Sequence, residues 1–516
     1  MTKKETCFIK TKRLCDIRTE CSAEISLPDY NTDVRKILHV SAKPHPISSF
    51  ASGEGIECSG EVTFEVVYLD FEGVVCTASF SGDYSFKAKC DTESYKDSLV
   101  ETTLGSLSLR LMSPRKIAAK ATLESTVTVL TEDVLVTAGD ALNPDLDPQI
   151  DPIFISAHHT SMTPPAEREY GCSLARFDGK TTDEVHLIHL SVHPILERLD
   201  VLGGEVEING RINVAALIRT DECPLYKLEK TLDLSEKIPL DEAFCDGEHR
   251  AVIEVVSASV ATEGDESGVE MTLSVITETR IVSDKNVELE LISDMYLCDR
   301  PCECAREVFS YDECLGHFTV VEELDDKVPL SEIGAGKIRE VIFADATAKV
   351  TDVETREDCI VAKGEIKVSA IASEMKSDGG VEFAPLKFSV KFEKNVNSNC
   401  QLDDKTLAFV GASLNGASVI VDSDNVYIKG DMSFDVHLSK RHETEILTSA
   451  TVSSGNAYQK NPARIAVYYP MAGDTLYTVA KAYHTTKEKL ILDNSELADV
   501  MAKDGEVSYV KRLIIT

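Results

Sequence analysis

Most of the chain alternates apolar and polar residues with a period of two, the pattern that predicts β-strands. Residues 62–68 read Val-Thr-Phe-Glu-Val-Val-Tyr, and residues 366–371 read Ile-Lys-Val-Ser-Ala-Ile. Apolar spacing typical of helices is scarce before residue 470. The pattern therefore predicts a mainly β body.

This body contains an internal repeat with a period of about 150 residues. In each copy a glycine begins an alternating strand, and a second apolar run lies upstream of it. These glycines are Gly60, Gly210 and Gly364. Leu38, Ile188 and Ile342, in the upstream runs, each precede their glycine by 22 positions. We predict three tandem β-domains, in which each glycine marks a bulge or a close backbone approach within a strand.

The upstream runs also contain candidate catalytic or ligand-binding residues. His39 and His189 occupy equivalent positions in the first two repeats, and Phe343 occupies that position in the third. A catalytic or ligand-binding histidine would not be replaced by phenylalanine in a working copy of the site. The pattern favours packing.

Proline content places the joins between the repeats. Residues 143–169 are punctuated by proline and poor in β-branched residues, which predicts an extended linker. We predict a second linker, containing four cysteines, at residues 293–329. The predicted units are repeat 1 at 1–142, a linker at 143–169, repeat 2 at 170–292, a linker at 293–329, repeat 3 at 330–455 and a C-terminal module at 462–516.

Cysteines could in principle bind a metal in the second linker. Cys298, Cys302, Cys304 and Cys314 have the spacing C-x3-C-x-C-x9-C, and zinc takes four such ligands. Structural zinc sites usually present C-x2-C pairs, which this spacing lacks. We therefore favour reduced thiols, or later oxidative cross-linking, and expect no metal and no cofactor. The odd total of 15 cysteines and the absence of a secretory pattern near Met1 also favour reduced thiols in the cytoplasm.

Charge narrows the classes of partner. The chain has 88 Asp plus Glu against 53 Lys plus Arg, a formal net charge of −35, which disfavours nucleic acid and anionic membrane surfaces. Residues 462–516 contain seven residues of each sign, so the body carries the whole excess. This break supports a domain boundary near residue 461. No apolar run is long enough to predict a membrane-spanning helix, so direct membrane insertion is not expected.

After residue 462 the pattern changes to strand, helix, helix and strand. Asp474 or Thr475 can cap a helix whose apolar face begins at Leu476, and Thr485 with Glu488 predicts the start of a second helix. Gly473-Asp474-Thr475-Leu476, the helix containing Val479 to Tyr483, and Asn494 after the second helix resemble a LysM module. The expected fold class is thus three tandem β-domains followed by a small βααβ LysM-like α+β domain.

The whole architecture resembles SipL-like spore-coat morphogenetic proteins of endospore-forming Firmicutes, which have three SPOCS-type β repeats and a C-terminal LysM domain. The run from Leu27 to Leu38, the three glycine–strand units and the LysM-like end carry this resemblance. It implies a non-enzymatic adaptor in the mother cell, at the forespore surface or spore coat. It also implies that the LysM domain docks onto a coat-basement ATPase of the SpoIVA type, with other coat proteins as further partners.

Candidate contact residues follow from the LysM-like pattern. They are Gly473, Asp474, Thr475, Leu476 and Tyr477 at the first loop, and Asn494 at the second. Leu476 is expected to support the core, whereas Tyr477 is expected to point elsewhere and to contact the partner. An alternative is that the same loops bind N-acetylglucosamine of peptidoglycan. A hydrolase is the weakest hypothesis, because no nucleophile, phosphate-loop or acid–base motif is complete and the body repeats three times without one.

Overall fold

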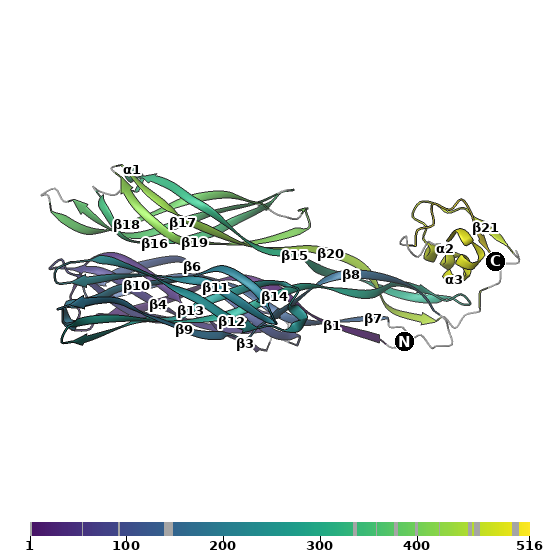
Figure 1. Cartoon of the computed structure of the whole chain (residues 1–516). Helices are drawn as coiled ribbons and strands as arrows, with labels where there is room; N and C mark the ends of the chain where they lie inside the picture. The colour runs from purple at the N-terminus through teal and green to yellow at the C-terminus, as the bar shows by residue number, and fades with distance from the viewer. Residues whose placement is uncertain are drawn as a thin grey trace.

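The structure, a computed structural model, describes residues 3–53, 55–90, 93–138, 148–333, 338–357, 359–375, 380–397, 401–422, 424–452, 457–458, 465–497 and 505–516. It is mainly β and antiparallel, which confirms the predicted fold class at that level. Figure 1 shows an elongated body, a narrower stalk at one end of it, and the C-terminal module beyond the stalk. Within these ranges, no helix is long and apolar enough to cross a membrane.

Each repeat supplies two antiparallel sheets, named here the short sheet and the long sheet. The short sheets are β2 (Val34–Pro44), β4 (Gly55–Asp70) and β5 (Val75–Lys89), with β3 (Ser48–Ser52) beside β4; β10 (Val185–Leu202), β11 (Glu205–Thr220) and β12 (Tyr226–Pro239); and β16 (Ile338–Thr355), β17 (Cys359–Met375) and β18 (Val381–Asn397). The central strand of each is the one that carries the repeat-defining glycine.

The long sheet joins the first strand of a repeat, or the first two strands in the second repeat, to its last two. These sheets are β1 (Lys3–Ser26), β7 (Lys116–Ala138) and β6 (Tyr95–Ser113); β8 (Gln149–Met162) and β9 (Ala166–Asp178) with β14 (Gly268–Tyr296) and β13 (Glu248–Asp265); and β15 (Cys302–Pro329), β20 (Asn425–Val452) and β19 (Thr406–Asp422). Between strands lie the short helix α1 (Leu330–Ile333) and the 3-10 turns η2 (Thr182–Glu184) and η3 (Glu242–Phe244).

The two sheets of a repeat pack face to face. In the first repeat Val62 and Phe64 of β4 share one core with Ala121 and Leu123 of β7. The second and third repeats have equivalent cores between their short and long sheets. Because strand side chains alternate between faces, the period-two pattern of the sequence places one apolar set in each core. Full burial of a side chain such as Phe64 stabilises the fold by roughly 1.5–3 kcal/mol.

The repeat-defining glycines lie where a side chain would collide with a neighbour. A Cβ atom added to Gly210 or Gly364 would lie 2.1 Å from a carbonyl oxygen of the adjacent strand. At Gly60 it would lie 2.8 Å from the ring of Tyr84 on β5. The three glycines therefore serve close packing within the short sheets, and none of them needs a ligand to explain it.

Both predicted linkers contain long strands, which corrects the predicted boundaries. Within 143–169, strand β8 pairs with the C-terminal half of β14, and β9 then pairs with its N-terminal half. Residues 163–165, which include Pro164 and Pro165, separate the two strands. Proline is tolerated at the edge of a sheet, so Pro152 does not interrupt β8. Residues 139–147 lie outside the described residues.

The second correction concerns residues 293–329. Strand β14 continues to Tyr296, and β15 occupies most of the remainder as the first strand of the third long sheet. It pairs along its whole length with β20, from Cys302 opposite Val452 to Pro329 opposite Asn425. Cys302, Cys304 and Cys314 are therefore part of a sheet, whereas Cys298 lies in the short connection between β14 and β15. The segment does not link two separate domains.

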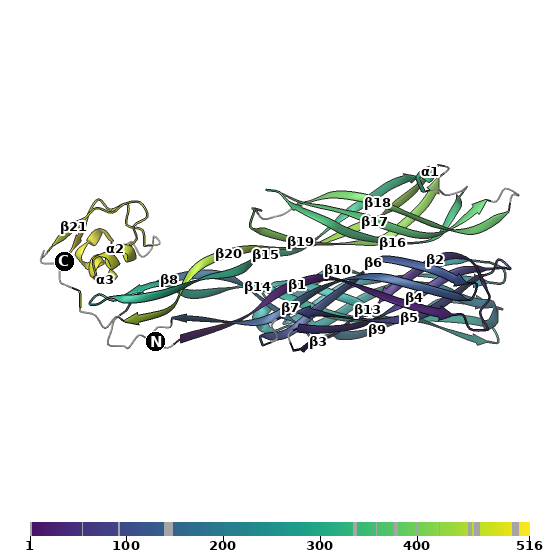
Figure 2. The ribbon, with the colours of Figure 1, turned by 180° about the vertical axis from the view of Figure 1, so that it is seen from behind.

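Parts of the long strands extend past the sandwiches and form the stalk. Figures 1 and 2 show that β1 and β7, β8 and β14, and β15 and β20 run together toward the C-terminal module. Each repeat contributes to one apolar stalk core, through Leu135 of the first repeat, Ile155 and Leu289 of the second and Ile446 of the third. The stalk thus joins three units that are far apart in sequence.

At the body, the three short sheets meet around a common axis. The rings of His39 and His189 lie 5.1 Å apart between centroids, those of His39 and Phe343 5.4 Å, and those of His189 and Phe343 5.1 Å. These equivalent positions form a nearly equilateral triangle, which confirms the packing role predicted for them. Leu38, Ile188 and other apolar residues from all three repeats surround the triangle. The repeats therefore close into a ring with approximate threefold symmetry.

We expect Gly364→Ala to destabilise the chain by about 1–3 kcal/mol, because the new methyl group collides with backbone and overpacking carries that cost. Gly411→Ala in β19 is the matched control, since its Cβ atom would meet nothing closer than 3.9 Å. That control should stay within about 0.5 kcal/mol of the parent. Urea unfolding followed by circular dichroism measures both, and equal midpoints for the two variants would contradict the collision.

Candidate functional site

The C-terminal module has the predicted order of elements. These are β21 (Ala466–Tyr468), α2 (Leu476–Ala482), α3 (Lys487–Asp493), the 3-10 turn η4 (Ser495–Leu497) and β22 (Leu513–Ile515). Strands β21 and β22 pair antiparallel, with Val467 opposite Ile514. Leu476, Val479, Ala480 and Leu490 fill the core between helices and sheet. The order strand, helix, helix, strand is therefore observed.

The first predicted loop is organised by its own hydrogen bonds. Gly473 has φ of 90°, a left-handed conformation that favours glycine. The Thr475 side chain caps α2 by accepting a hydrogen bond from the Thr478 backbone N–H at 3.1 Å. Leu476 is buried at the start of the helix, as expected for a core residue. Helix α3 begins one residue later than predicted, because Thr486 rather than Thr485 is its cap.

Asp474 and Asn494 use their polar groups inside the module. The Asp474 carboxylate accepts hydrogen bonds from the Met471 backbone N–H and the Tyr468 hydroxyl, both at 2.7 Å, and these bonds lower its pKa. The buried Asn494 amide donates to the carbonyl oxygens of Leu490 and Ile514 at 2.9 and 2.7 Å and accepts from the Ile514 N–H at 2.7 Å. Asn494 thus ties the end of α3 to β22.

The structure does not support Tyr477 as an exposed contact residue. Its side chain is 5% exposed and packs edge-on against Tyr296, the last residue of β14, at 5.3 Å between ring centroids. Burial raises the pKa of Tyr477 above its ordinary value. The expectation that Tyr477 points away from the buried face is wrong, because the end of the stalk covers that side of α2.

This contact is the main link between the module and the stalk. The Tyr296 hydroxyl donates a 2.7 Å hydrogen bond to the Thr485 carbonyl oxygen. Asp294 pairs with Lys481 of α2 and with Arg306 of β15. These partners lower the pKa of Asp294 although burial opposes them. Tyr296 belongs to the apolar core of the module itself, so the module is docked on the stalk.

The opposite side of the module exposes an apolar row. Ile465, Val467 and Tyr469 follow one another at alternate positions and are 62%, 50% and 68% exposed. Ile514 of β22 lies beside Val467 and is also exposed. Ala466 and Tyr468, between them, face the core. Residues 465–469 are thus apolar on both faces of the strand. The sequence shows this run, but an exposed apolar surface was not predicted from it.

The four candidate zinc ligands do not come together. Cys302, Cys304 and Cys314 all lie on β15, where each residue advances the strand by about 3.3 Å. Cys304 and Cys314 are therefore separated by roughly 30 Å along the strand. In the part of the chain that the structure describes, no three His, Cys, Asp or Glu side chains are placed to hold a metal ion.

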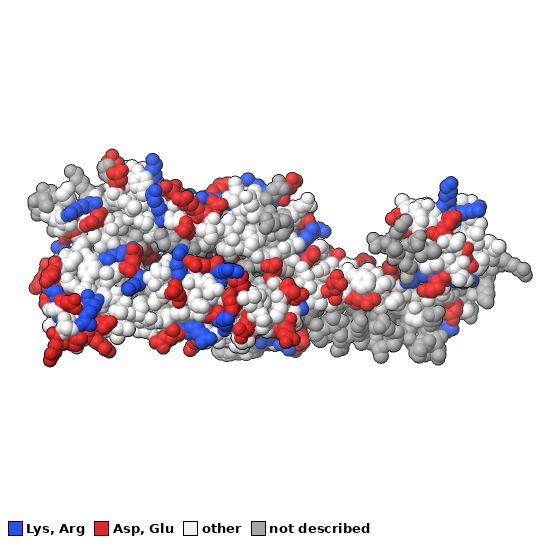
Figure 3. Space-filling model, in the orientation of Figure 1, with Lys and Arg blue, Asp and Glu red and all other residues white. Residues whose placement is uncertain are grey.

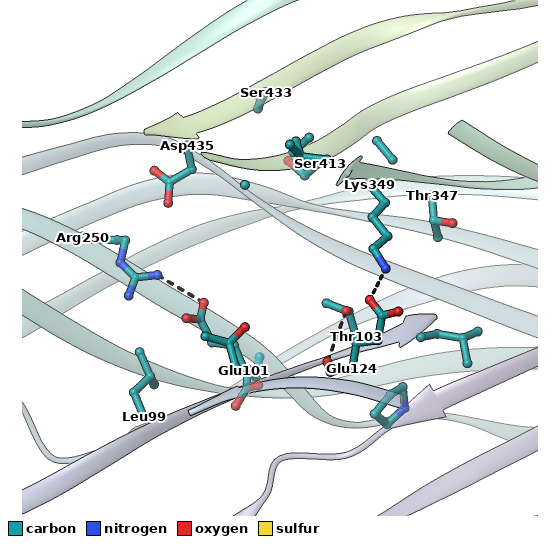
Figure 4. A pocket seen from close by; sticks show the side chains of 18 of the residues that line it. Leu99, Glu101, Thr103, Glu124, Arg250, Thr347, Lys349, Ser413, Ser433 and Asp435 are labelled. Carbon is teal, nitrogen blue, oxygen red and sulfur yellow. Dashed lines mark hydrogen bonds and ion pairs between the residues drawn. The ribbon is translucent and has the colours of Figure 1, made fainter. Parts of the chain in front are cut away.

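A cavity of about 3500 Å³ lies between the three repeats. Figure 4 shows charged pairs that cross it: Arg250 of the second repeat faces Glu101 of the first at 3.1 Å, and Lys349 of the third pairs with Glu124 of the first. Burial, together with nearby Glu278 and Glu101, raises the pKa of Glu254 in its wall to about 7. The lining combines apolar side chains with polar side chains of both charges, and its polar groups can bind water.

Acidic side chains outnumber basic ones on the face of the body that Figure 3 shows. They are scattered among basic residues, and a dense group lies at the end of the body opposite the module. A surface of this kind repels polyanions and promotes solubility, but it does not by itself define a binding site. The features that point to recognition are therefore on the C-terminal module.

No family model matches the chain, and no curated protein matches it. Among solved structures, the crystal structure of a lipopolysaccharide binding protein is 7% identical over 51% of this chain and 91% of that chain, with a TM-score of 0.08. So low a score carries no argument about fold or function.

We expect Tyr296→Ala to release the module from the stalk, since loss of a buried aromatic ring costs about 3 kcal/mol. Tyr296→Phe keeps the ring and loses one hydrogen bond, worth about 1 kcal/mol, so it should largely preserve docking. Hydrogen–deuterium exchange in α2 measures release in the full chain. If the alanine variant protects α2 as well as the parent does, this contact does not hold the module.

Proposed function

We propose that the chain is a non-enzymatic structural and adaptor protein of endospore coat assembly. Its C-terminal LysM-like module docks onto a coat-basement ATPase of the SpoIVA type, and its body, read as three SPOCS-type repeats, offers surfaces to other coat proteins. The site of action is the mother cell, at the forespore surface. The resemblance of the repeats and of the module to spore-coat morphogenetic proteins supports this proposal.

The observation that carries it is the exposed apolar row of Ile465, Val467 and Tyr469 with Ile514. Contiguous apolar surface on a small module favours contact with another protein. Aromatic residues such as Tyr469 are enriched at the centres of protein interfaces. The row faces away from the stalk contact, so a partner can reach it while the module stays docked.

The same geometry weighs against peptidoglycan as the primary ligand. Sugar hydroxyls are recognised through hydrogen bonds, and the predicted loops already use theirs internally. All three hydrogen bonds of the Asn494 amide, two donated and one accepted, go to backbone groups of the module, and Asp474 accepts two. The predicted second loop continues into residues 498–504, which lie outside the described residues.

We expect Val467→Asp to weaken binding of the full chain to a candidate coat ATPase about tenfold or more, because residues at the centre of an interface contribute at least about 1.4 kcal/mol. Leu492→Asp is the matched control: Leu492 is exposed and apolar but lies on α3, not on the sheet that carries the row. Surface plasmon resonance measures both. Purified peptidoglycan is assayed in parallel, and retention on it with no binding to the ATPase would make the module a glycan-binding domain.

A further inference from the structure

The three contacts around the body axis differ in chemistry although they are equivalent in position. His39 Nδ1 lies 3.1 Å from the Ser369 hydroxyl of the third repeat, and His189 Nδ1 lies 2.7 Å from the Glu65 carboxylate of the first. Ser369 and Glu65 each follow their repeat glycine by five positions. The third such position is Ala215, which packs against the apolar cluster that contains Phe343.

The three contacts thus differ: a histidine ring meets a hydroxyl in one, a carboxylate in the second, and a phenylalanine ring lies in an apolar cluster with an alanine in the third. Each histidine contacts the repeat that precedes its own in cyclic order. His189 of the second repeat contacts the first, and His39 of the first repeat contacts the third. The first-to-third contact closes the ring. It is supported by an ion pair between Arg35 and Glu382 at 2.6 Å and by a hydrogen bond from Lys36 Nζ to the Phe383 carbonyl oxygen at 3.3 Å.

Both histidines are enclosed, with 1% exposure for His39 and 3% for His189. The Nε2 atoms of both rings are buried and without a hydrogen-bond partner. The charged or titratable groups that act on His39 are Glu65 on β4, His189 on β10, Asp345 on β16 and Lys387 on β18. Lys43 of β2 lies 3.9 Å from Glu65 and competes for that carboxylate. A proton on His39 would therefore be poorly compensated.

The pKa directions agree with this geometry. Burial, and then the neighbouring His189, lower the pKa of His39 to about 4. Burial alone would raise the pKa of Glu65, but the hydrogen bond from His189 and the charge of Lys43 lower it on balance. At neutral pH the ring thus contains a neutral His39 and an ionised Glu65 already paired with His189.

We propose that His39 makes the closed ring of repeats sensitive to acid. The ring stays closed while this side chain is neutral, and the first and third repeats separate when it gains a proton. The apolar stalk core of Leu135, Ile155, Leu289 and Ile446 keeps the repeats tethered. Opening would expose the cavity between the repeats to solvent. This inference does not depend on the proposed function of the module.

The direction of the pH effect follows from linkage. In the open state His39 has its ordinary pKa of about 6.5, whereas closure lowers it, so the open state binds more protons. The stabilisation that closure provides is complete above about pH 6.5 and decreases as the pH falls toward 4. For one such histidine, the opening equilibrium constant rises about 30-fold between pH 7.5 and pH 5.

The chain provides its own matched controls. In the double variant His39→Phe with Ser369→Ala, the contact between the first and third repeats has a phenylalanine and an alanine. It then has the same residue types as the equivalent positions Phe343 and Ala215. The single variant Ser369→Glu instead places a carboxylate beside the ring of His39, as Glu65 lies beside His189, and a nearby carboxylate stabilises a protonated imidazole. Both variants should stay closed at pH 5, for different physical reasons, and the second remains informative if the first does not fold.

The measurement is hydrogen–deuterium exchange of β2, β17 and β18 in the full chain at pH 7.5 and pH 5, corrected for the intrinsic pH dependence of exchange. We expect the loss of protection between pH 7.5 and pH 5 to be at least about tenfold greater in the parent than in either variant. Burial lowers the pKa of His437 of β20 to about 4 and raises the pKa of Glu254 to about 7. Both residues are unchanged in all three proteins, so comparing the proteins removes their effects. Equal changes of protection in the parent and in both variants would overturn the proposal.

Discussion

The contact of three side chains on one axis is the constraint on which the rest of the body depends. His39, His189 and Phe343 come from strands that are about 150 residues apart, yet their rings touch pairwise. Their meeting requires each short sheet to turn its upstream strand toward the axis. The long sheets meet as well: they line the cavity between the repeats, and Arg250 of β13 pairs with Glu101 of β6 across it. The contact on the axis thus works together with polar contacts between the long sheets.

The stalk and the C-terminal module follow from that arrangement. Because the repeats surround one axis, their long strands leave the body together and bury a shared apolar core. The stalk ends at Tyr296 and Asp294, which dock the module through α2. The apolar row on β21 then faces outward. The body acts, in this interpretation, as a rigid support that presents one surface of the module to a partner.

Much of the fold could be predicted from local pattern. The period-two alternation and the fixed 22-residue offset identified the strands of the short sheets, and the capping residues identified the two helices of the module. These signals are local because strands and helices are specified by neighbours in sequence. The assignment of residues 149–162 and 302–329 to linkers failed because edge strands tolerate proline and because β15 alternates weakly.

The candidate site was less predictable, since it depends on contacts between distant segments. Nothing near Tyr477 in sequence indicates that Tyr296 covers it. The four cysteines are close in sequence, but an extended strand separates them in space. By contrast, the presence of Phe343 where the other repeats have histidine correctly indicated packing. Equivalent positions in a repeat share an environment, so one of them indicates the role of the others. The apolar row from Ile465 to Tyr469 could have been predicted from the sequence, by considering the residues on the two faces of the strand separately.

The most direct test of the adaptor interpretation is a hydrogen–deuterium exchange footprint of the full chain with and without a candidate coat ATPase. We predict new protection at β21 and β22, with exchange at α2 and at the axis strands unchanged, because the module binds through its outward face while docked. A footprint on α2 in place of β21, or no footprint on the module at all, would contradict the claim that the docked module presents its sheet to the partner.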